Sequence, residues 1–521
     1  MKRRPFIIAG MMLAIALLEF VVGVVLSGGR FAYPLDDTYI HMAMAREFAT
    51  SGTWGLEAGV PVFASSSPLW TLVLASVFKV FGFRILIPLV LAALFAFLAL
   101  AFVVRHWLDN GVSVAYAWIT AGLFPLCVPL VSLVNLGMEH ALHFLLIVLV
   151  LIAAERILRG DSGRRDLAML ALWSLLATGA RYESLFITFP VAVILAVERR
   201  FSAAVVTVVA SAAAVCAFGF YALACGGPFL PVSVLMKGGV SGLEGVSTAV
   251  FDIYKRLSAD SVHAVLTLLF LAGAAALPAV SRRMRSLALG LAVAVGGHLV
   301  FARLGWLYRY EAYLLGAAFM MIPPMAAGIS RFSFGDGIER VYRKSAMAVV
   351  AVALGFPFVF RGLMANVDTI LAQREICGQQ VQVARLFRML PPELKGPIAV
   401  NDLGCAAWDA GVHILDIWGL GSPEVAELRM KGKMTTEICA GLFKSHHIRY
   451  AAFYPNWYRP EGLSPDLKVV ARLEMLTPRV ICGGDTVFLA VMRPEDVAPF
   501  KARLSEWAED LPPTSRLVVL D

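Results

Sequence analysis

The chain has 521 residues, of which 59% are hydrophobic and only 16% are charged, and its mean hydropathy is +0.76. A water-soluble protein of this size would expose too much apolar surface, so the composition predicts a protein that crosses a membrane several times. The apolar runs lack the alternation of a transmembrane barrel, so we expect helices to span the membrane. The net charge of +8 does not indicate that the protein binds nucleic acid. Lys and Arg are concentrated in the short loops between apolar runs, where they indicate how the chain is oriented in the membrane.

The first apolar run extends from Phe6 to about Leu26 and follows Lys2, Arg3 and Arg4. A signal peptide begins in a similar way, but this run is long and has no clean cleavage site, so we expect a retained helix. Further runs of spanning length lie at roughly 84–104, 115–134, 140–158, 166–180, 184–198, 202–224, 262–280, 286–303, 311–329 and 346–362. The sequence thus predicts about eleven transmembrane helices, although 166–180 and 184–198 could form one long span.

Basic residues fall on alternate loops between these runs, and the positive-inside rule assigns such loops to the cytoplasm. The protein would then be a multi-pass protein of the cytoplasmic (inner) membrane, with its N-terminus inside and its C-terminus outside. The loops with unusual polar residues all fall outside under this scheme, and they hold Asp36-Asp37, Glu139-His140, Arg181 to Glu183, Lys237 and Arg309 to Glu311. Two independent patterns therefore indicate an external site.

The polar tail predicts a division into a membrane domain, residues 1–363, and an extracytoplasmic domain, residues 364–521. A helical pattern runs from Ile370 to Leu390, and strand patterns follow at 397–401, 413–417, 449–454, 468–476 and 486–492. Strands that alternate with helices predict a small soluble α/β domain. Three residues of the tail could form a sugar-stacking surface, although such residues are more often turn and core positions: Asp402, Trp408 and Asp409.

The cysteines divide by region. Cys127, Cys216 and Cys225 lie in or beside apolar runs, where cysteine packs as a small hydrophobic residue. The other four, Cys377, Cys405, Cys439 and Cys482, lie in the tail. An external location would permit one or two disulfides there, with a pairing that the sequence does not determine.

The first external loop, residues 27–83, contains the most informative polar segment. Adjacent carboxylates at Asp36 and Asp37 open an amphipathic segment with His41, and Ser65 to Trp70 lead back to the bilayer. Ionisable groups at a membrane are costly and usually functional. Capping of the helix that opens at Asp37 is the structural alternative, and it could coexist with a catalytic role.

An enzyme outside the membrane has no access to ATP or nucleotide sugars, so activated building blocks arrive there as polyprenyl-phosphate lipids. Transfer of a sugar from such a lipid needs a carboxylate base, cations that hold the departing phosphate, and an apolar groove. Asp36 or Asp37 suits the base. Because adjacent carboxylates point in different directions, one would face the acceptor and the other a structural partner.

Cations of the external loops are candidates for holding the phosphate. Arg181, Lys237 and Arg309 are of this kind, and Glu183 and Tyr310 lie beside two of them as further substrate-binding candidates. Snorkelling of long cations at the membrane interface is the structural alternative.

Glu139 and His41 complete the set of candidates. Glu139 begins an external helix, where it would contact the acceptor, act as a second acid, or stabilise the first turn. His41 follows Asp37 by four residues, so the two side chains could bind a divalent metal from one helix face. A phosphate-lipid donor does not require a metal, and we expect no cofactor to be needed.

The segment from Asp36 to Trp70 resembles the first external loop of the GT-C glycosyltransferase superfamily, and is most similar to membrane arabinofuranosyltransferases and their bacterial relatives. The likeness rests on Asp36-Asp37, Tyr39, Ala45-Arg46, Ser51-Gly52, Trp54-Gly55, Gly59, Pro61 and Ser65 to Trp70. It is close over residues 34–83 and topological elsewhere. It implies a polytopic GT-C fold, an external active site, Asp36 as the catalytic base and Asp37 as the second acid.

Two shorter motifs extend this resemblance. Gly137-Met138-Glu139 resembles a Gly-(Met/Leu)-Glu motif of these relatives. Arg181-Tyr182-Glu183 matches their Arg-Pro-acidic motif except at the middle position, which leaves the role of Arg181 open.

The sequence therefore predicts an inverting, metal-independent glycosyltransferase of the membrane. It would move a pentose or hexose from a polyprenyl-phosphate donor to a glycan or glycolipid acceptor of the cell envelope. A transporter or lipid flippase is the alternative, but such proteins usually show internal repeats, and this sequence shows none. A third reading keeps the fold without activity and uses the tail to bind glycans.

Overall fold

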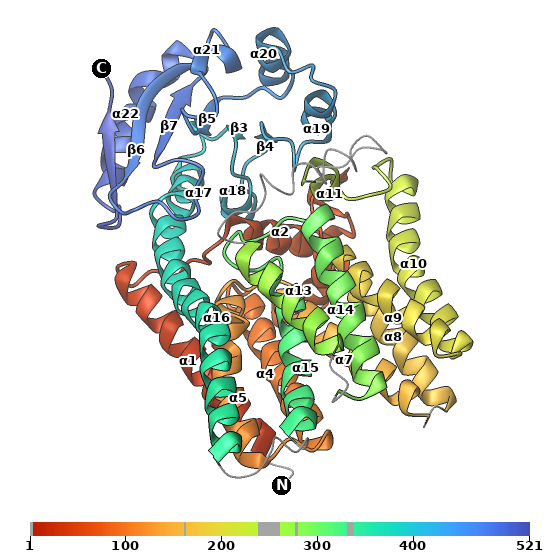
Figure 1. The fold of residues 1–521 in the computed structure, drawn as a ribbon. Coiled ribbons are helices and arrows are strands. Elements are labelled where there is room, and N and C mark those ends of the chain that lie inside the picture. Colours follow the sequence, from red (N-terminus) through yellow and green to blue (C-terminus); the bar gives the residue numbers. More distant parts are fainter. Residues whose placement is uncertain (1–3, 161–162, 238–260, 277–279, 331–337) are drawn as a thin grey trace.

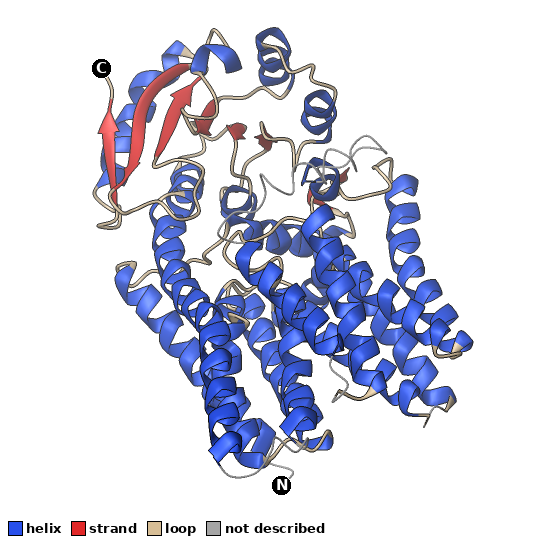
Figure 2. Ribbon diagram, viewed as in Figure 1, coloured by secondary structure: helices blue, strands red, loops and turns tan. Residues whose placement is uncertain are grey.

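Helices form one elongated bundle, and a mixed α/β domain covers one end of it (Figure 1). The computed structural model describes residues 4–160, 163–237, 261–276, 280–330 and 338–521, and the structural statements below concern these residues. The N-terminal end of the chain lies at the end of the bundle away from the α/β domain (Figure 1). Apart from one short hairpin, the strands are confined to this domain (Figure 2).

Each apolar run of the sequence corresponds to a helix of the bundle. These helices are α1 (Arg4–Leu26), α4 (Ile87–Asp109), α5 (Val114–Cys127), α7 (His140–Arg159), α8 (Arg164–Ala180), α9 (Leu185–Val197), α10 (Phe201–Ala224), α13 (Ser261–Ala276), α14 (Arg282–Phe301), α15 (Ala312–Ser330) and α16 (Ile338–Gly378). Within the described residues, five of them are long and apolar enough to cross a membrane: α1, α4, α7, α10 and α14. The other apolar helices are shorter, so the predicted number of spans stays a prediction.

The run at 115–134 forms two helices rather than the single one predicted. Helix α5 ends at Cys127, and α6 (Leu130–Asn135) begins after Pro129, whose φ is −11°. Proline has no N–H to donate to the preceding turn, and Pro125 already removes one such bond inside α5. The prediction of one continuous span was wrong here because it followed hydropathy alone.

Helix α16 carries the chain from the bundle directly into the α/β domain. It runs from Ile338 to Gly378 without a break, so the predicted domain boundary at 363 lies inside a helix. The helical pattern predicted over 370–390 is divided between the end of α16 and α17 (Gln380–Met389). A continuous helix at this junction is a stiffer connection than a loop, and it fixes the domain over the end of the bundle.

The α/β domain is built on a six-stranded sheet with the order β4-β3-β5-β7-β6-β8. The strands are β3 (Ile398–Val400), β4 (Ile414–Asp416), β5 (Tyr450–Phe453), β6 (Lys468–Met475), β7 (Thr486–Val491) and β8 (Ser515–Val519). The first five match predicted strands, and β8 was not predicted. Strand β3 is parallel to β4 and β5, and the other pairs are antiparallel.

Short helices complete the domain: α18 (Gly404–Asp409), α19 (Pro423–Met430), α20 (Thr436–Ser445), α21 (Pro460–Leu463) and α22 (Val497–Ala508). Helix α22 covers one face of the sheet, where Phe500 stacks on Tyr450 with ring centroids 4.6 Å apart and on Phe387 of α17 at 6.4 Å. These buried aromatic contacts give the domain a hydrophobic core of its own, beside the core of the bundle.

The predicted external loop lies between the bundle and the α/β domain. It contains α2 (Asp36–Ser51), the hairpin β1 (Gly55–Glu57) and β2 (Val60–Pro61), and α3 (Pro68–Phe81). Helix α2 lies across the end of the bundle (Figure 1) and packs against α3 and α18. The residues of α2 from Thr38 to Ala45 are buried, so the first half of the loop is held by packing.

The basic loops gather at the other end of the bundle. Arg283 lies 3.5 Å from Glu155, Arg282 lies 3.2 Å from Glu198, and Arg159 donates to Asn110 at 2.8 Å. These contacts join loops that are far apart in the sequence. The separation of basic loops from polar motif loops, which the sequence predicted, is thus present in the fold, while the side that faces the cytoplasm stays a prediction.

Candidate active site

Asp36 ties the external loop to the α/β domain. Its carboxylate accepts hydrogen bonds from the backbone N–H groups of Gly404, at 2.5 Å, and Cys405, at 2.8 Å. A Cβ atom at position 404 would lie only 2.0 Å from the backbone oxygen of Asp36, so only glycine allows this approach. The residue that caps α2 is Leu35, without a side-chain hydrogen bond, so neither aspartate is the N-cap. Burial raises the pKa of Asp36.

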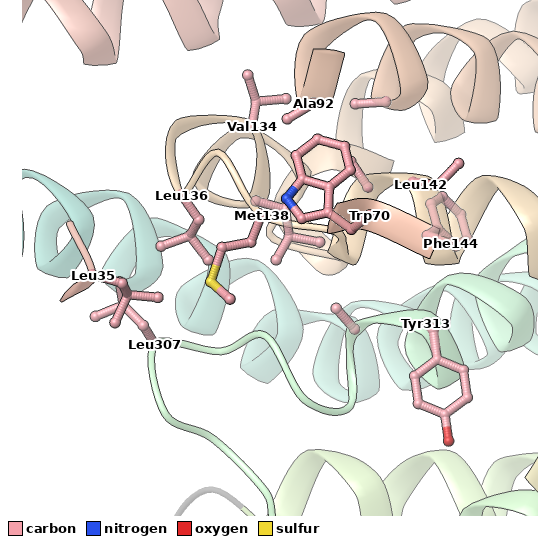
Figure 3. Close-up of a cluster of buried hydrophobic side chains, with 14 of the residues drawn as sticks. Leu35, Trp70, Ala92, Val134, Leu136, Met138, Leu142, Phe144, Leu307 and Tyr313 are labelled. Carbon is pink, nitrogen blue, oxygen red and sulfur yellow. The ribbon is translucent and has the colours of Figure 1, made fainter. Parts of the chain in front are cut away.

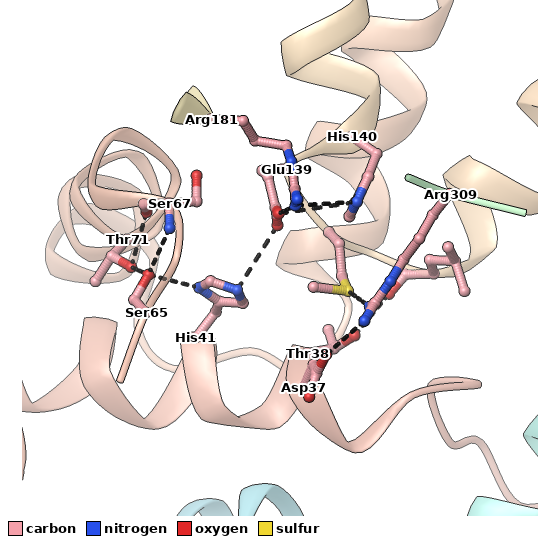
Figure 4. Close-up of polar contacts among 12 residues, drawn as sticks. Asp37, Thr38, His41, Ser65, Ser67, Thr71, Glu139, His140, Arg181 and Arg309 are labelled. Carbon is pink, nitrogen blue, oxygen red and sulfur yellow. Dashed lines mark hydrogen bonds and ion pairs between the residues drawn. The ribbon is translucent and has the colours of Figure 1, made fainter. Parts of the chain in front are cut away.

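Asp37 forms an ion pair with Arg309. Oδ2 of Asp37 accepts from Nη2 of Arg309 at 2.6 Å, and Nη1 of the same arginine donates to Sδ of Met138 at 2.8 Å (Figure 4). The guanidinium also lies over the ring of Tyr310, 5.0 Å from its centroid. Arg309 is buried, and its Nε has no acceptor among the described residues. A buried N–H without an acceptor is unfavourable unless a ligand supplies one.

A strained backbone segment positions Arg309. Gly305, Trp306, Leu307 and Tyr308 all have positive φ angles, of 71°, 48°, 58° and 61°. For the three residues with side chains this conformation costs about 1–3 kcal/mol each, and such strain clusters at functional sites. The turn is held by the carboxylate of Glu311, which accepts from Gly305 N at 2.9 Å and pairs with Arg361.

A second buried network joins α2 to α7 and α8. Oε1 of Glu139 accepts from Nη1 of Arg181 at 2.5 Å (Figure 4). The arginine also pairs with Glu183. Nε2 of His41 lies 3.6 Å from Oε2 of Glu139, and its Nδ1 lies 3.1 Å from Oγ of Ser65. Glu139 is fully buried. A buried carboxylate is stable only when it is paired, so Arg181 is required here as a counterion.

The polar loops are anchored by apolar neighbours in sequence. Leu35 precedes Asp36, Met138 precedes Glu139, and Leu307 lies two residues before Arg309. The three apolar side chains are buried in one hydrophobic cluster (Figure 3). Their burial fixes the main chain next to each of these charged residues, and therefore keeps the polar side chains in place.

Two cavities meet at Asp37. The bundle cavity, of about 300 Å³, is lined by α2, the start of α9 and the loop after α14, and includes Asp37, His41, Arg181, Phe186, Arg303 and Arg309. The interdomain cavity, of about 260 Å³, lies between the bundle and the α/β domain and includes Asp36, Asp37, Asp402, Trp418 and Trp457. Six residues line both cavities: Asp37, Ile40, Ser233, Arg303, Tyr310 and Leu420.

Comparison with known proteins identifies the fold of this chain but not a reaction. The family model "Domain of unknown function (DUF8728)" matches residues 374–490, and the curated proteins gave no match. The crystal structure of ArnT from Cupriavidus metallidurans bound to undecaprenyl phosphate is similar over 92% of this chain and 97% of that chain, with 12% identity and a TM-score of 0.52. The chain therefore has the fold of this ArnT structure, in agreement with the GT-C type of fold predicted from the sequence.

The structure of ArnT from the same organism in the apo state is also similar, with 13% identity, a TM-score of 0.49 and coverage of 92% of this chain and 97% of that one. The first comparison and the apolar helices agree on a multi-pass membrane protein of GT-C type with a sheet-containing C-terminal domain. The predicted fold class is thereby confirmed. The arabinofuranosyltransferase subtype stays a prediction.

The GT-C fold brings most of the predicted site residues to one place. The predicted site residues that line the bundle cavity are Asp37, His41, Arg181, Glu183, Arg309 and Tyr310. Asp36 lines the interdomain cavity, and Glu139 contacts Arg181 and His41. Lys237 is the last residue of α11 (Val232–Lys237), and its side chain lies outside the described part of the structure. Their roles in the reaction stay predictions.

The three tail residues considered for a sugar-stacking surface do not lie together in the structure. Asp402 lines the interdomain cavity. Trp408 instead packs on Phe78 and lies 4.9 Å below the guanidinium of Arg46, while Asp409 pairs with Arg388. Neither of these two lines either cavity. The structural alternative given for this trio is thus the better description of Trp408 and Asp409.

Sequence reasoning missed several residues that line the two cavities, among them Arg303, Trp418 and Trp457. Arg303 lines both cavities, but it was taken as the end of a span. Trp418 and Trp457 line the interdomain cavity and follow β4 and β5. The sequence offered one signal for the tryptophans, their position directly after short apolar strands, where ligand-binding side chains often lie.

The disulfides that the sequence left open are not formed in the structure. All seven cysteines are free thiols. Among the described residues, no group of three or more His, Cys, Asp and Glu side chains is arranged to hold a metal ion. Asp37 and His41, the pair considered for a metal, contact Arg309 and Ser65 respectively.

Proposed function

We propose that the protein is a membrane glycosyltransferase that moves a sugar from a polyprenyl-phosphate donor to a glycan or glycolipid acceptor. The observation that carries this proposal is the position of Asp37, which lines both cavities and pairs with a buried arginine. The reaction would occur at the outer face of the cytoplasmic membrane. The similar ArnT structure, which holds undecaprenyl phosphate, supports a lipid-linked donor.

The bundle cavity suits the donor. Arg181, Arg303 and Arg309 supply positive charge on its wall, and Phe186 and Phe301 supply apolar surface. A polyprenyl phosphate combines an anionic head with an apolar tail, so both kinds of wall are needed. Guanidinium groups bind phosphate through charge-assisted, often bidentate, hydrogen bonds.

Asp37 is our choice for the base. Among the described carboxylates it alone lines both cavities, so it can face an acceptor in one and a donor in the other. Both carboxylate oxygens of Asp36 accept N–H groups of α18, which favours a positioning role. Asp36 as base, which the family resemblance implies, is the alternative.

In the proposed reaction, the Asp37 carboxylate takes the proton of the acceptor hydroxyl as its oxygen attacks the anomeric carbon. The bond from that carbon to the phosphate oxygen breaks, and its electron pair leaves with the polyprenyl phosphate. The arginines stabilise the charge that grows on this oxygen. Attack from the cavity opposite the leaving group predicts inversion at the anomeric carbon.

Incubation of purified protein in lipid nanodiscs with a panel of polyprenyl-phosphate sugars and cell-envelope acceptors tests the function. We expect release of polyprenyl phosphate and a new glycosidic product by mass spectrometry. A donor that crosses the bilayer without cleavage would instead support the flippase alternative. The control is Glu427→Gln, which removes an exposed carboxylate that lines neither cavity and should leave product formation unchanged.

A further inference from the structure

The exposed tryptophans of the protein gather at one place. The chain has ten tryptophans, all within the described residues, and three are exposed: Trp306 at 53%, Trp418 at 40% and Trp457 at 41%. All three line the interdomain cavity. Exposed indoles are unfavourable in water unless they meet a ligand or partner. Their concentration on one cavity therefore indicates a binding surface.

The cavity lies where ligands bind in α/β domains. Strands β3, β4 and β5 are mutually parallel through β3. Their carboxyl ends are followed by Asp402, Trp418 and Trp457, respectively, and all three residues line the cavity. Loops at the carboxyl ends of parallel strands form the usual binding crevice of open α/β sheets. The bundle closes this crevice from the other side with Trp306.

The indole groups are held in place before any ligand binds. The rings of Trp418 and Trp457 lie 5.0 Å apart at an angle of 44°, and the guanidinium of Arg429 lies 4.3 Å from the centroid of Trp418. The carboxylate of Asp416 accepts from the backbone N–H groups of Trp418 and Gly421, each at 2.8 Å. A platform that is ordered in advance loses little conformational entropy on binding.

Most polar groups of the cavity are acceptors, and Arg303 is the one cation among its described lining residues. Asp36, Asp37 and Asp402 line it, and Asn401 adds an amide. Oδ2 of Asp402 already accepts from the hydroxyl of Tyr454 at 2.7 Å and from Nε2 of Gln380 at 2.6 Å. Acceptor oxygens of this kind suit the hydroxyl and amine donors of a ligand better than they suit an anionic group.

From this geometry we infer that the interdomain cavity binds a neutral or amine-bearing sugar of the acceptor, stacked on Trp418 and Trp457. A sugar ring has an apolar C–H face, which suits an indole, and hydroxyl groups around its rim, which suit carboxylates. Asp37 lies on the wall of the same cavity, so a bound sugar would present a hydroxyl to the proposed base. The inference rests on the proposed function and assigns the C-terminal domain a role in acceptor selection.

Binding to an array of immobilised neutral, amino and uronic-acid oligosaccharides tests the inference with the full-length protein in detergent. We expect wild-type protein to retain neutral or amino sugars, and Trp418→Ala with Trp457→Ala to lose at least about tenfold in affinity. The Phe variants at both positions keep a flat ring and should recover part of it. The control Leu476→Ala truncates an exposed apolar side chain elsewhere in the same domain and should bind as wild type does.

Trp306→Ala is a second test of sugar binding in case the double variant fails to fold. Trp306 belongs to the bundle, so this variant leaves the α/β domain unchanged. This variant should also weaken sugar binding, by about threefold or more for one lost stacking contact. Unchanged binding in a folded variant, preference for uronic acids, or no retention of any sugar by the wild type would each overturn the inference.

Donor turnover separates this inference from the proposed function. If array binding depends on the tryptophans but no polyprenyl-phosphate sugar is ever cleaved, the sugar site stands and the proposed reaction fails. If the double variant transfers sugar with an unchanged KM for the acceptor, the reaction stands and the sugar site is wrong.

Discussion

Oδ2 of Asp37 lies 2.6 Å from Nη2 of Arg309, although the two residues are 272 positions apart in the chain. The arginine is buried and the aspartate is partly exposed toward two cavities. The guanidinium and the carboxylate therefore share a short, charge-assisted hydrogen bond. The pair therefore combines a proton acceptor with a group that can stabilise a departing phosphate.

Replacement of Gly404 by alanine should weaken the docking of the α/β domain. The new Cβ would lie 2.0 Å from the backbone oxygen of Asp36, which forces the two parts of the chain apart. We expect a loss of about 1–3 kcal/mol in thermal unfolding and faster amide exchange at α18.

Gly441→Ala is the matched control, because a Cβ at this position of α20 meets nothing within 4 Å. It should be neutral or stabilising by about 0.5–1 kcal/mol. Equal stability of the two variants would show that the contact of Asp36 with α18 is not needed for docking.

Arg303→Met should reduce sugar transfer without unfolding the protein. Arg303 is exposed and lines both cavities, so its removal leaves no buried partner without a counterion. We expect the release of polyprenyl phosphate to slow about tenfold or more, because charge on the leaving oxygen is less stabilised. The melting temperature should stay within about 2 °C of wild type, the shift of a small surface change.

Arg105→Met removes an exposed cation at the opposite end of the bundle and serves as the control for Arg303→Met. Transfer at the wild-type rate by both variants would show that Arg303 does not hold the phosphate.

Asp402 makes the stability of the α/β domain depend on pH. Burial, together with the charge of Asp36, raises the pKa of Asp402 from 3.8 to about 8. Because the folded state holds the proton more tightly than the unfolded state, stability is greatest at low pH and falls as the pH rises through about 8.

In Asp402→Asn this contribution is absent, so its melting temperature should fall less than that of wild type between pH 5 and pH 9. Asn keeps an oxygen that can accept from Tyr454 and Gln380. Parallel curves for the two proteins, measured by differential scanning fluorimetry, would rule out a raised pKa at this position.

Much of the bundle could be predicted from the sequence because helices that face lipid appear as long apolar runs. Exposed apolar residues such as Leu18, Val90 and Phe189 lie on helices that match predicted runs. Errors arose where local chemistry opposed hydropathy, as at Pro129. Strand β8 was missed because Ser515–Val519 is one short strand at the edge of the sheet.

The site was only partly predictable, for a different reason. Asp36 and Asp37 stand out because two adjacent acids are rare at a membrane edge. Trp418, Trp457 and Arg303 do not stand out, because their proximity depends on how the α/β domain docks on the bundle. The sequence pattern of each element predicts its type, whereas the packing between distant elements creates the cavity.

Asp37, at the junction of the two cavities, is the proposed base of sugar transfer. The most direct test measures kcat and donor affinity for Asp37→Asn and Asp36→Asn, with release of polyprenyl phosphate as the readout. We predict that Asp37→Asn binds the donor normally but loses about 10²–10⁴-fold in kcat, whereas Asp36→Asn loses mainly stability. Normal kcat in Asp37→Asn, with the loss found instead in a stably folded Asp36→Asn, would contradict the account.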